Sequence, residues 1–215
     1  DKQRPDFAKK LLFVVAGRGW TGDDNNVSSI FSYNGRLLGR QYKQQRFWKT
    51  DNGEVGLLEG LRNPGKESTI CEVEQIGQIM FAICRDVSDR SRTREMARIF
   101  HPQFLLVPAW SSSIHNGFEA QFGEIIQQNH RTCSVVCNCC EAYGTEMENR
   151  DLNGIITIPY KDKSIITGKT YQLMRNEECW KDGPCGGCIF MADFDFRPKK
   201  EKTLRVIKKI KQNKP

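Results

Sequence analysis

A short apolar run that ends abruptly at a thiol constrains this chain more than any other feature. In residues 78–86, Gln-Ile-Met-Phe-Ala-Ile-Cys-Arg-Asp, five apolar residues lead to Cys84 and two charged residues follow it. Such a run is typical of a buried strand that reaches the edge of its sheet. Because α/β sheets bind ligands just beyond that edge, a thiol there is a candidate nucleophile. Taken alone, the run also fits one more buried cysteine, since free cysteine is among the most buried residue types.

The remaining pattern predicts a layered α/β domain. Apolar periodicity predicts strands and helices in the order strand pair, then strand, helix, strand, helix and strand, then further strands. The predicted strands are 11–16, 27–33, 36–42, 103–107, 133–138, 155–158, 164–166 and 187–196. The predicted helices are 91–100, with Met96, Ala97, Ile99 and Phe100 on its apolar face, and 118–129. Segment 44–70 is rich in glycine and is expected to be a long irregular loop of functional importance.

Composition excludes some classes of protein. Hydrophobic residues make up 38% of the chain and charged residues 27%, and no apolar run approaches the roughly 18 residues that a membrane-spanning helix needs. The polar start lacks the apolar core of a signal peptide. Nine cysteines without framework spacing indicate reduced thiols, so a cytoplasmic location is expected.

The positive charge is concentrated at the C-terminus. Residues 197–215 hold nine lysines or arginines and one glutamate, a net charge of +8, whereas the remaining chain carries 24 basic and 25 acidic residues. Such a tail can contact nucleic acid or an acidic partner, or can be a solvated extension, and Leu204, Ile207 and Ile210 allow a short amphipathic helix there.

Six short motifs, in order, resemble the nitrilase or carbon–nitrogen hydrolase superfamily. Tyr42-Lys43 after the Asn34-Gly35 turn, with Phe47 four residues beyond the lysine, resembles the lysine motif of that family. Ile83-Cys84-Arg85-Asp86 resembles its nucleophile elbow. The remaining similar segments are 94–98, 105–110, 128–129 and 135–138. The resemblance runs from about residue 11 to residue 196, which is most of the chain, and implies that these residues are the later part of a nitrilase-like domain. It implies an αββα sandwich that is incomplete at its N-terminus, with a lead-in or linker at residues 1–10 and a basic tail at 197–215.

The same resemblance implies a glutamate, a lysine and a cysteine acting together on an amide or nitrile. A thiolate attacks the carbon, a carboxylate moves the protons, and an ammonium with a backbone N–H stabilises the developing negative charge. In this chain those roles fall to Cys84 as nucleophile, Lys43 as the ammonium and Arg85 as the backbone donor. Glu54 best fits the second glutamate of the family, with Glu59 in reserve. Trp110 and His115 are possible pocket residues, and no cofactor or metal is implied.

Three departures from the family pattern bear on activity. The first glutamate of the family, the general base, lies on a strand well upstream of the lysine, and the acids before Lys43 are Asp1, Asp6, Asp23 and Asp24, none of which follows an apolar strand. Arg85 replaces the usual aromatic residue, which adds a positive charge that favours an ionised thiol or selects an acidic ligand. Residues 87–91 and Gln128 also differ from the common pattern.

The late cysteines suggest an alternative, a structural zinc site. Cys185-Gly-Gly-Cys188 is a C-x-x-C pair, and further thiols are Cys137, Cys139, Cys140 and Cys179. Paired C-x-x-C spacing is absent, and the three histidines show no ligand spacing, so zinc is the less favoured interpretation.

Three functions therefore remain open. The leading one is a thiol hydrolase of the carbon–nitrogen class acting through an acyl-enzyme at Cys84. The second is a catalytically inactive nitrilase-like module that serves for binding or assembly in a longer protein, such as a fusion to a bacterial antiviral reverse transcriptase. The third is a zinc-bearing nucleic-acid module. The family resemblance also implies a homo-oligomer, often a dimer, or an intramolecular partner domain.

Overall fold

The structure is a computed structural model in which two helices, one 3₁₀ turn and four sheets are placed. It describes residues 13–20, 26–32, 35–45, 48–51, 54–57, 64–73, 77–88, 92–109, 114–138, 152–162, 165–174, 192–193 and 205–206. No helix among these residues is long and apolar enough to cross a membrane.

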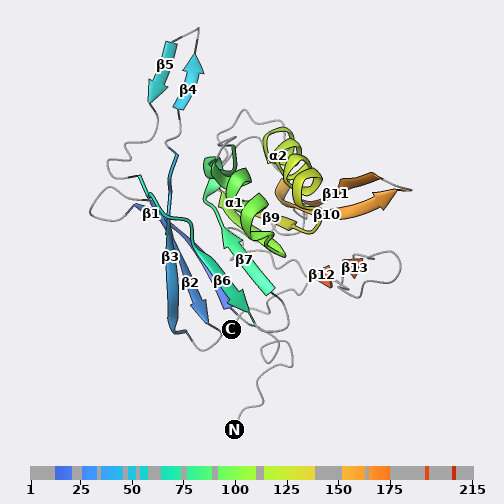
Figure 1. Cartoon of the computed structure of the whole chain (residues 1–215). Helices are drawn as coiled ribbons and strands as arrows, with labels where there is room; N and C mark the ends of the chain where they lie inside the picture. Colours follow the sequence, from blue (N-terminus) through green and yellow to red (C-terminus); the bar gives the residue numbers. More distant parts are fainter. Residues whose placement is uncertain are drawn as a thin grey trace, which may run out of the picture.

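A six-stranded mixed sheet forms the centre of the molecule. Its strand order is β11-β10-β9-β8-β7-β6. The strands are β6 (Ile70–Val73), β7 (Gly77–Phe81), β8 (Phe104–Ala109), β9 (Cys133–Asn138), β10 (Leu152–Asp162) and β11 (Ile165–Met174). The three middle strands β7, β8 and β9 run parallel, and the flanking strands pair with them antiparallel. Parallel neighbours require crossover connections, which α1 (Arg92–Phe100) and α2 (Ile114–Asn129) supply on one face of the sheet (Figure 1).

Alternation along the strands divides the apolar side chains between two faces. On the helix face, Met80, Leu105 and Val136 join Phe122 and Ile125 of α2 in the main core cluster. On the opposite face, Ile79 and Phe81 of β7 pack against Ile30 of β2. Because successive strand residues point to opposite sides, β7 is buried on both faces, which explains its uninterrupted apolar sequence.

The second face of the central sheet is covered by a three-stranded antiparallel sheet of β1 (Phe13–Trp20), β2 (Asn26–Ser32) and β3 (Leu37–Tyr42). The β2–β3 hairpin predicted from Asn34-Gly35 is confirmed, and Gly35 has a φ of 83°, a conformation that glycine adopts without steric cost. The described residues thus supply a helix layer and two facing sheets of the expected αββα arrangement (Figure 1).

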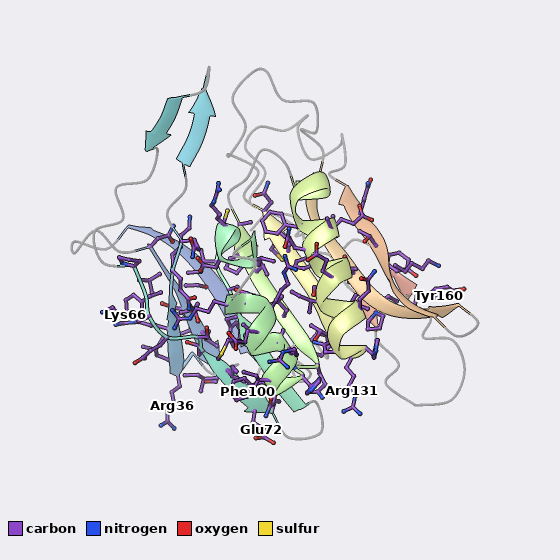
Figure 2. The ribbon with its side chains drawn as sticks, turned by 45° about the horizontal axis from the view of Figure 1, so that its top comes forward. Arg36, Lys66, Glu72, Phe100, Arg131 and Tyr160 are labelled. Carbon is purple, nitrogen blue, oxygen red and sulfur yellow. The ribbon has the colours of Figure 1, made fainter. Side chains whose placement is uncertain are left out.

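Two local predictions were wrong. Segment 44–70 is not wholly irregular, because β4 (Trp48–Asp51) and β5 (Glu54–Leu57) form a hairpin there. On α1, Ile99 and Phe100 are exposed, as Figure 2 shows for Phe100. The buried side of this nine-residue helix is set by Thr93 and Ala97, and at about 100° per residue Ile99 lies about 200° from Ala97. In the tail, residues 205–206 form β13, which pairs with β12 (Ala192–Asp193), and the residues on which a tail helix would depend, Leu204, Ile207 and Ile210, lie outside the described residues.

Candidate active site

A tight turn follows β7 and carries Cys84. The Asp86 N–H donates a 3.0 Å hydrogen bond to the Ile83 carbonyl, and the Ile83 N–H donates a 3.1 Å bond to Asp86 Oδ2. These two bonds close a loop that has Cys84 and Arg85 at its corner, where the 3₁₀ turn Cys84–Ser88 begins. Cys84 is half-buried and packs against the main core cluster, so its thiol is neither sealed inside the core nor fully in solvent.

The backbone of Cys84 is strained. Its φ is 46°, in the left-handed region, which costs a non-glycine residue about 1–3 kcal/mol. Within the described ranges the other non-glycine residues with positive φ are His101 and His130, and each directly follows a helix and closes its last turn through its N–H. Helix ends commonly adopt this conformation, whereas the strain at Cys84 occurs in a turn at the carboxyl edge of a parallel strand. Strain in such a place is typical of functional sites.

Lys43 lies directly after β3 and is only 4% exposed. Its N–H donates to the Asn26 carbonyl, and its own carbonyl accepts from the Gly65 N–H, both at 2.8 Å. Gly65 approaches so closely that a Cβ there would lie 2.7 Å from the carbonyl oxygen of Tyr42. The backbone of Lys43 is therefore fixed between β2 and the segment 64–69.

The buried Gln41 side chain holds the same segment from β3. Its amide nitrogen donates to the Glu67 carbonyl at 3.2 Å, and its oxygen accepts the Thr69 N–H at 2.7 Å. An amide that both donates and accepts satisfies two backbone groups of segment 64–69. This network stabilises the chain on the side of Lys43 opposite to β2.

Asp86 connects the two segments that carry Lys43 and Cys84. Its Oδ1 accepts the Gln44 and Gln45 N–H groups at 2.9 and 2.7 Å, while its Oδ2 accepts the Ile83 N–H. One carboxylate thus accepts hydrogen bonds from the two residues directly after Lys43 and from the residue directly before Cys84. In the sequence Asp86 stands out only as the last residue of the motif 83–86. The signal in the sequence that could have pointed to Asp86 is an acidic residue placed between the apolar run 79–83 and Val87. In the structure Val87 is fully buried.

Burial of Asp86 sets its protonation behaviour. The side chain is 2% exposed, and desolvation of the charged form raises its pKa from 3.8 to about 6. The hydrogen bonds from Gln45, Gln44 and Ile83, together with the nearby charge of Lys43, lower the pKa but do not outweigh burial. At neutral pH Asp86 is therefore an ionised carboxylate beside the ammonium of Lys43.

This raised pKa predicts a pH dependence of stability. Between pH 3.8 and about 6 the folded protein binds more protons at Asp86 than the unfolded chain does, so this contribution favours folding at low pH and is lost as pH rises through 6. A shift of this size corresponds to about 3 kcal/mol. Urea unfolding of the wild type and of Asp86→Asn should show the free-energy difference between them falling by most of that amount from pH 4 to pH 7, since the carboxyl in the unfolded chain is already about half ionised at pH 4. Parallel pH profiles of the two proteins would contradict the assignment.

The other expected site residues are placed less completely. Arg85 is half-buried next to Cys84. Glu54 opens β5 in a hairpin that projects from the two facing sheets (Figure 1), and its side chain is not among those described. His115 lies in the first turn of α2, also without a described side chain, and Trp110 and Glu59 fall outside the described residues.

The zinc alternative concerns cysteines that are mostly outside the described residues. Cys137 is described and lies exposed near the end of β9, whereas the other five late cysteines are not described. In the part of the chain that the structure describes, no three histidine, cysteine or acidic side chains gather as potential metal ligands.

Comparison with solved structures identifies the class of fold. The NitN amidase from Nesterenkonia sp. AN1 superposes with a TM-score of 0.51 at 15% identity, over 77% of this chain and 62% of that one. The C. elegans NitFhit protein superposes with a TM-score of 0.55 at 14% identity, over 78% of this chain and 43% of that one. A mutant of the Nesterenkonia amidase, TM-score 0.50 and 14% identity over 75% and 60% of the two chains, shows the acetamide moiety of fluoroacetamide added covalently at its active-site cysteine.

The chain therefore has the nitrilase-superfamily fold, as the sequence resemblance predicted. It spans less than two thirds of the length of the NitN amidase. No family model matches the sequence, and no curated protein sequence matches it.

Proposed function

We propose that this chain is the later part of a carbon–nitrogen hydrolase domain that cleaves an amide or nitrile through an acyl-enzyme at Cys84. The observation that carries the proposal is the Asp86 carboxylate, which bonds both to the strained Cys84 turn and to the residues after Lys43. A half-buried thiol and a buried ammonium on segments joined in this way are the groups that acyl transfer requires.

The proposed reaction on an amide has two stages. The Cys84 thiol gives its proton to a carboxylate as its sulfur attacks the carbonyl carbon, and the negative charge that develops on the oxygen is stabilised by Lys43 and by the Arg85 N–H. The carbon–nitrogen bond breaks as a carboxylic acid gives its proton to the leaving amine, and water then hydrolyses the thioester to release the acid. By the family resemblance the proton carrier is a first glutamate, which is not among the residues before Lys43 in this sequence, and Glu54 is the second glutamate. Arg85 would favour substrates that carry a negative charge.

Covalent chemistry on the full-length protein tests this proposal. We expect ammonia release from simple aliphatic amides or nitriles, and capture of the acyl group by hydroxylamine as a hydroxamate. Peptide mapping after reaction with fluoroacetamide should find the adduct on Cys84, because a mutant of an amidase of this fold carries it at its active-site cysteine. A fully folded protein that neither turns over a broad amide and nitrile panel nor labels at Cys84 would contradict the proposal.

An inactive binding or assembly module of a larger protein is the second candidate. It is favoured by the partial coverage of the matched amidase and by the +8 charge of residues 197–215, which suits an acidic partner such as nucleic acid. Within this second candidate we also propose that the chain is part of a fusion with an antiviral reverse transcriptase, that it forms a homodimer and that it is located in the cytoplasm. Salt-dependent binding of single-stranded RNA or DNA by the full-length protein, lost when the basic residues of 197–215 are neutralised, would support this role.

A further inference from the structure

Asp86 has no assigned part in the reaction proposed above, although its buried carboxylate bonds to both reactive segments. We propose that Asp86 is a positioning residue, whose carboxylate holds the Cys84 turn and the Lys43 segment in a fixed relation. This inference rests on the proposed hydrolase function. It assigns to Asp86 no contact with substrate.

The Cys84 turn depends on Asp86 through both backbone and side chain. The Asp86 N–H bonds to the Ile83 carbonyl, and its Oδ2 accepts the Ile83 N–H, so one residue closes the turn from both ends. The Thr93 hydroxyl donates a 2.6 Å bond to the Asp86 carbonyl and fixes the turn to α1. A backbone that costs about 1–3 kcal/mol at Cys84 persists only where its surroundings over-determine it.

The Lys43 segment depends on the other carboxylate oxygen. Oδ1 accepts the N–H groups of two successive residues, Gln44 and Gln45. The Lys43 backbone is already hydrogen-bonded to Asn26 and Gly65. The bonds to Asp86 attach the same segment to the Cys84 turn as well. Bonds from backbone N–H groups to an ionised carboxylate are stronger than those between neutral groups.

The same bonds argue against a direct chemical role. Three N–H donors converge on a side chain that is 2% exposed, so neither oxygen faces a substrate or water. Asp86 therefore acts through the residues it holds. A displacement of about 1 Å at a reacting group can cost 10²-fold in rate, so loss of these bonds should appear in the chemistry of Cys84.

The rate at which iodoacetamide alkylates Cys84 measures how loss of the Asp86 bonds changes the reactivity of this thiol, and it does not require turnover. In the full-length protein, mass-spectrometric mapping compares the alkylation rate of Cys84 with that of Cys137 in the same molecule, an exposed residue whose thiol pKa is raised by desolvation and which serves as the unchanged reference. Asp86→Asn places an amide N–H against the Ile83 N–H and breaks that bond, and Asp86→Glu keeps the charge but moves it by one methylene. We expect both variants to lower the Cys84 to Cys137 rate ratio by about tenfold, with kcat falling at least as much and KM changing by less than about threefold.

Asn129→Ala is the matched control. Asn129 is also buried and bonds across segments, to Ala97 and Thr132, but it lies before β9. Since β7, β8 and β9 run parallel, that position is at the sheet edge opposite to Cys84. The control should lose stability and keep the alkylation ratio of the wild type.

Each outcome decides the role of Asp86. If folded Asp86→Asn and Asp86→Glu proteins keep the wild-type ratio, the positioning role is wrong. If neither variant folds, Thr93→Val decides, because it removes only the hydroxyl bond to the Asp86 carbonyl: a ratio lowered by about threefold supports the role and an unchanged ratio overturns it. If the wild type hydrolyses nothing but the ratio falls as expected, the positioning role stands and the hydrolase function fails.

Discussion

Replacing Cys84 with serine is expected to lower amide turnover by about 10⁴-fold or more, the scale of loss seen when a nucleophile is removed from an enzyme that forms a covalent intermediate. A hydroxyl is a far weaker nucleophile than a thiol near neutral pH unless a base activates it. Asp86, two residues along the chain, does not serve as that base, because three backbone N–H groups occupy its carboxylate. The expected result is therefore a folded protein without an acyl intermediate.

Ammonia release and hydroxamate formation measure this loss. Cys137→Ser is the matched control, because it makes the same atomic change at an exposed thiol near the end of β9. The control should retain wild-type turnover. Equal turnover of Cys84→Ser and wild type would mean that hydrolysis, if present, uses another nucleophile.

Replacing Lys43 with methionine is expected to lower kcat by about 10²–10³-fold. Methionine is close to lysine in length and fills the buried position, so the change removes the ammonium rather than the packing. The oxyanion would then be stabilised by backbone N–H groups alone. Removing the ammonium also deletes a charge that lowers the pKa of Asp86, so the titration of Asp86 in the Lys43→Met protein should move above pH 6.

Lys66→Met is the control for Lys43→Met. Lys66 is exposed, as Figure 2 shows, and belongs to the segment 64–69 that bonds to the Lys43 carbonyl through Gly65. Its replacement should leave kcat within about twofold of the wild type, since surface substitutions rarely change function or stability much. A Lys43→Met protein with wild-type kcat would remove Lys43 from the reaction.

The two variants together also separate the candidate functions. An enzyme should lose turnover in both and keep its fold. A binding module should show no turnover in the wild type and no change in partner binding on either substitution.

Sequence by itself determined the fold class and the two residues on which the proposed chemistry depends. The apolar run before Cys84 predicted a buried strand, and β7 is buried on both faces. The Asn34-Gly35 turn predicted the hairpin that ends next to Lys43. These features are local: a strand buried on both faces and a tight turn leave their pattern in consecutive residues.

Only the tertiary structure decided how these pieces meet. The bond from the Gln44 N–H to Asp86 joins residues 42 apart in the chain, and no periodicity encodes such a pair. The exposure of Ile99 likewise follows from which side of α1 packs on the sheet. The spacing of apolar residues along the helix does not show by itself which of them the sheet will cover. The left-handed φ of Cys84 and the raised pKa of Asp86 arise because packing from several segments holds one turn in place and keeps water from its carboxylate.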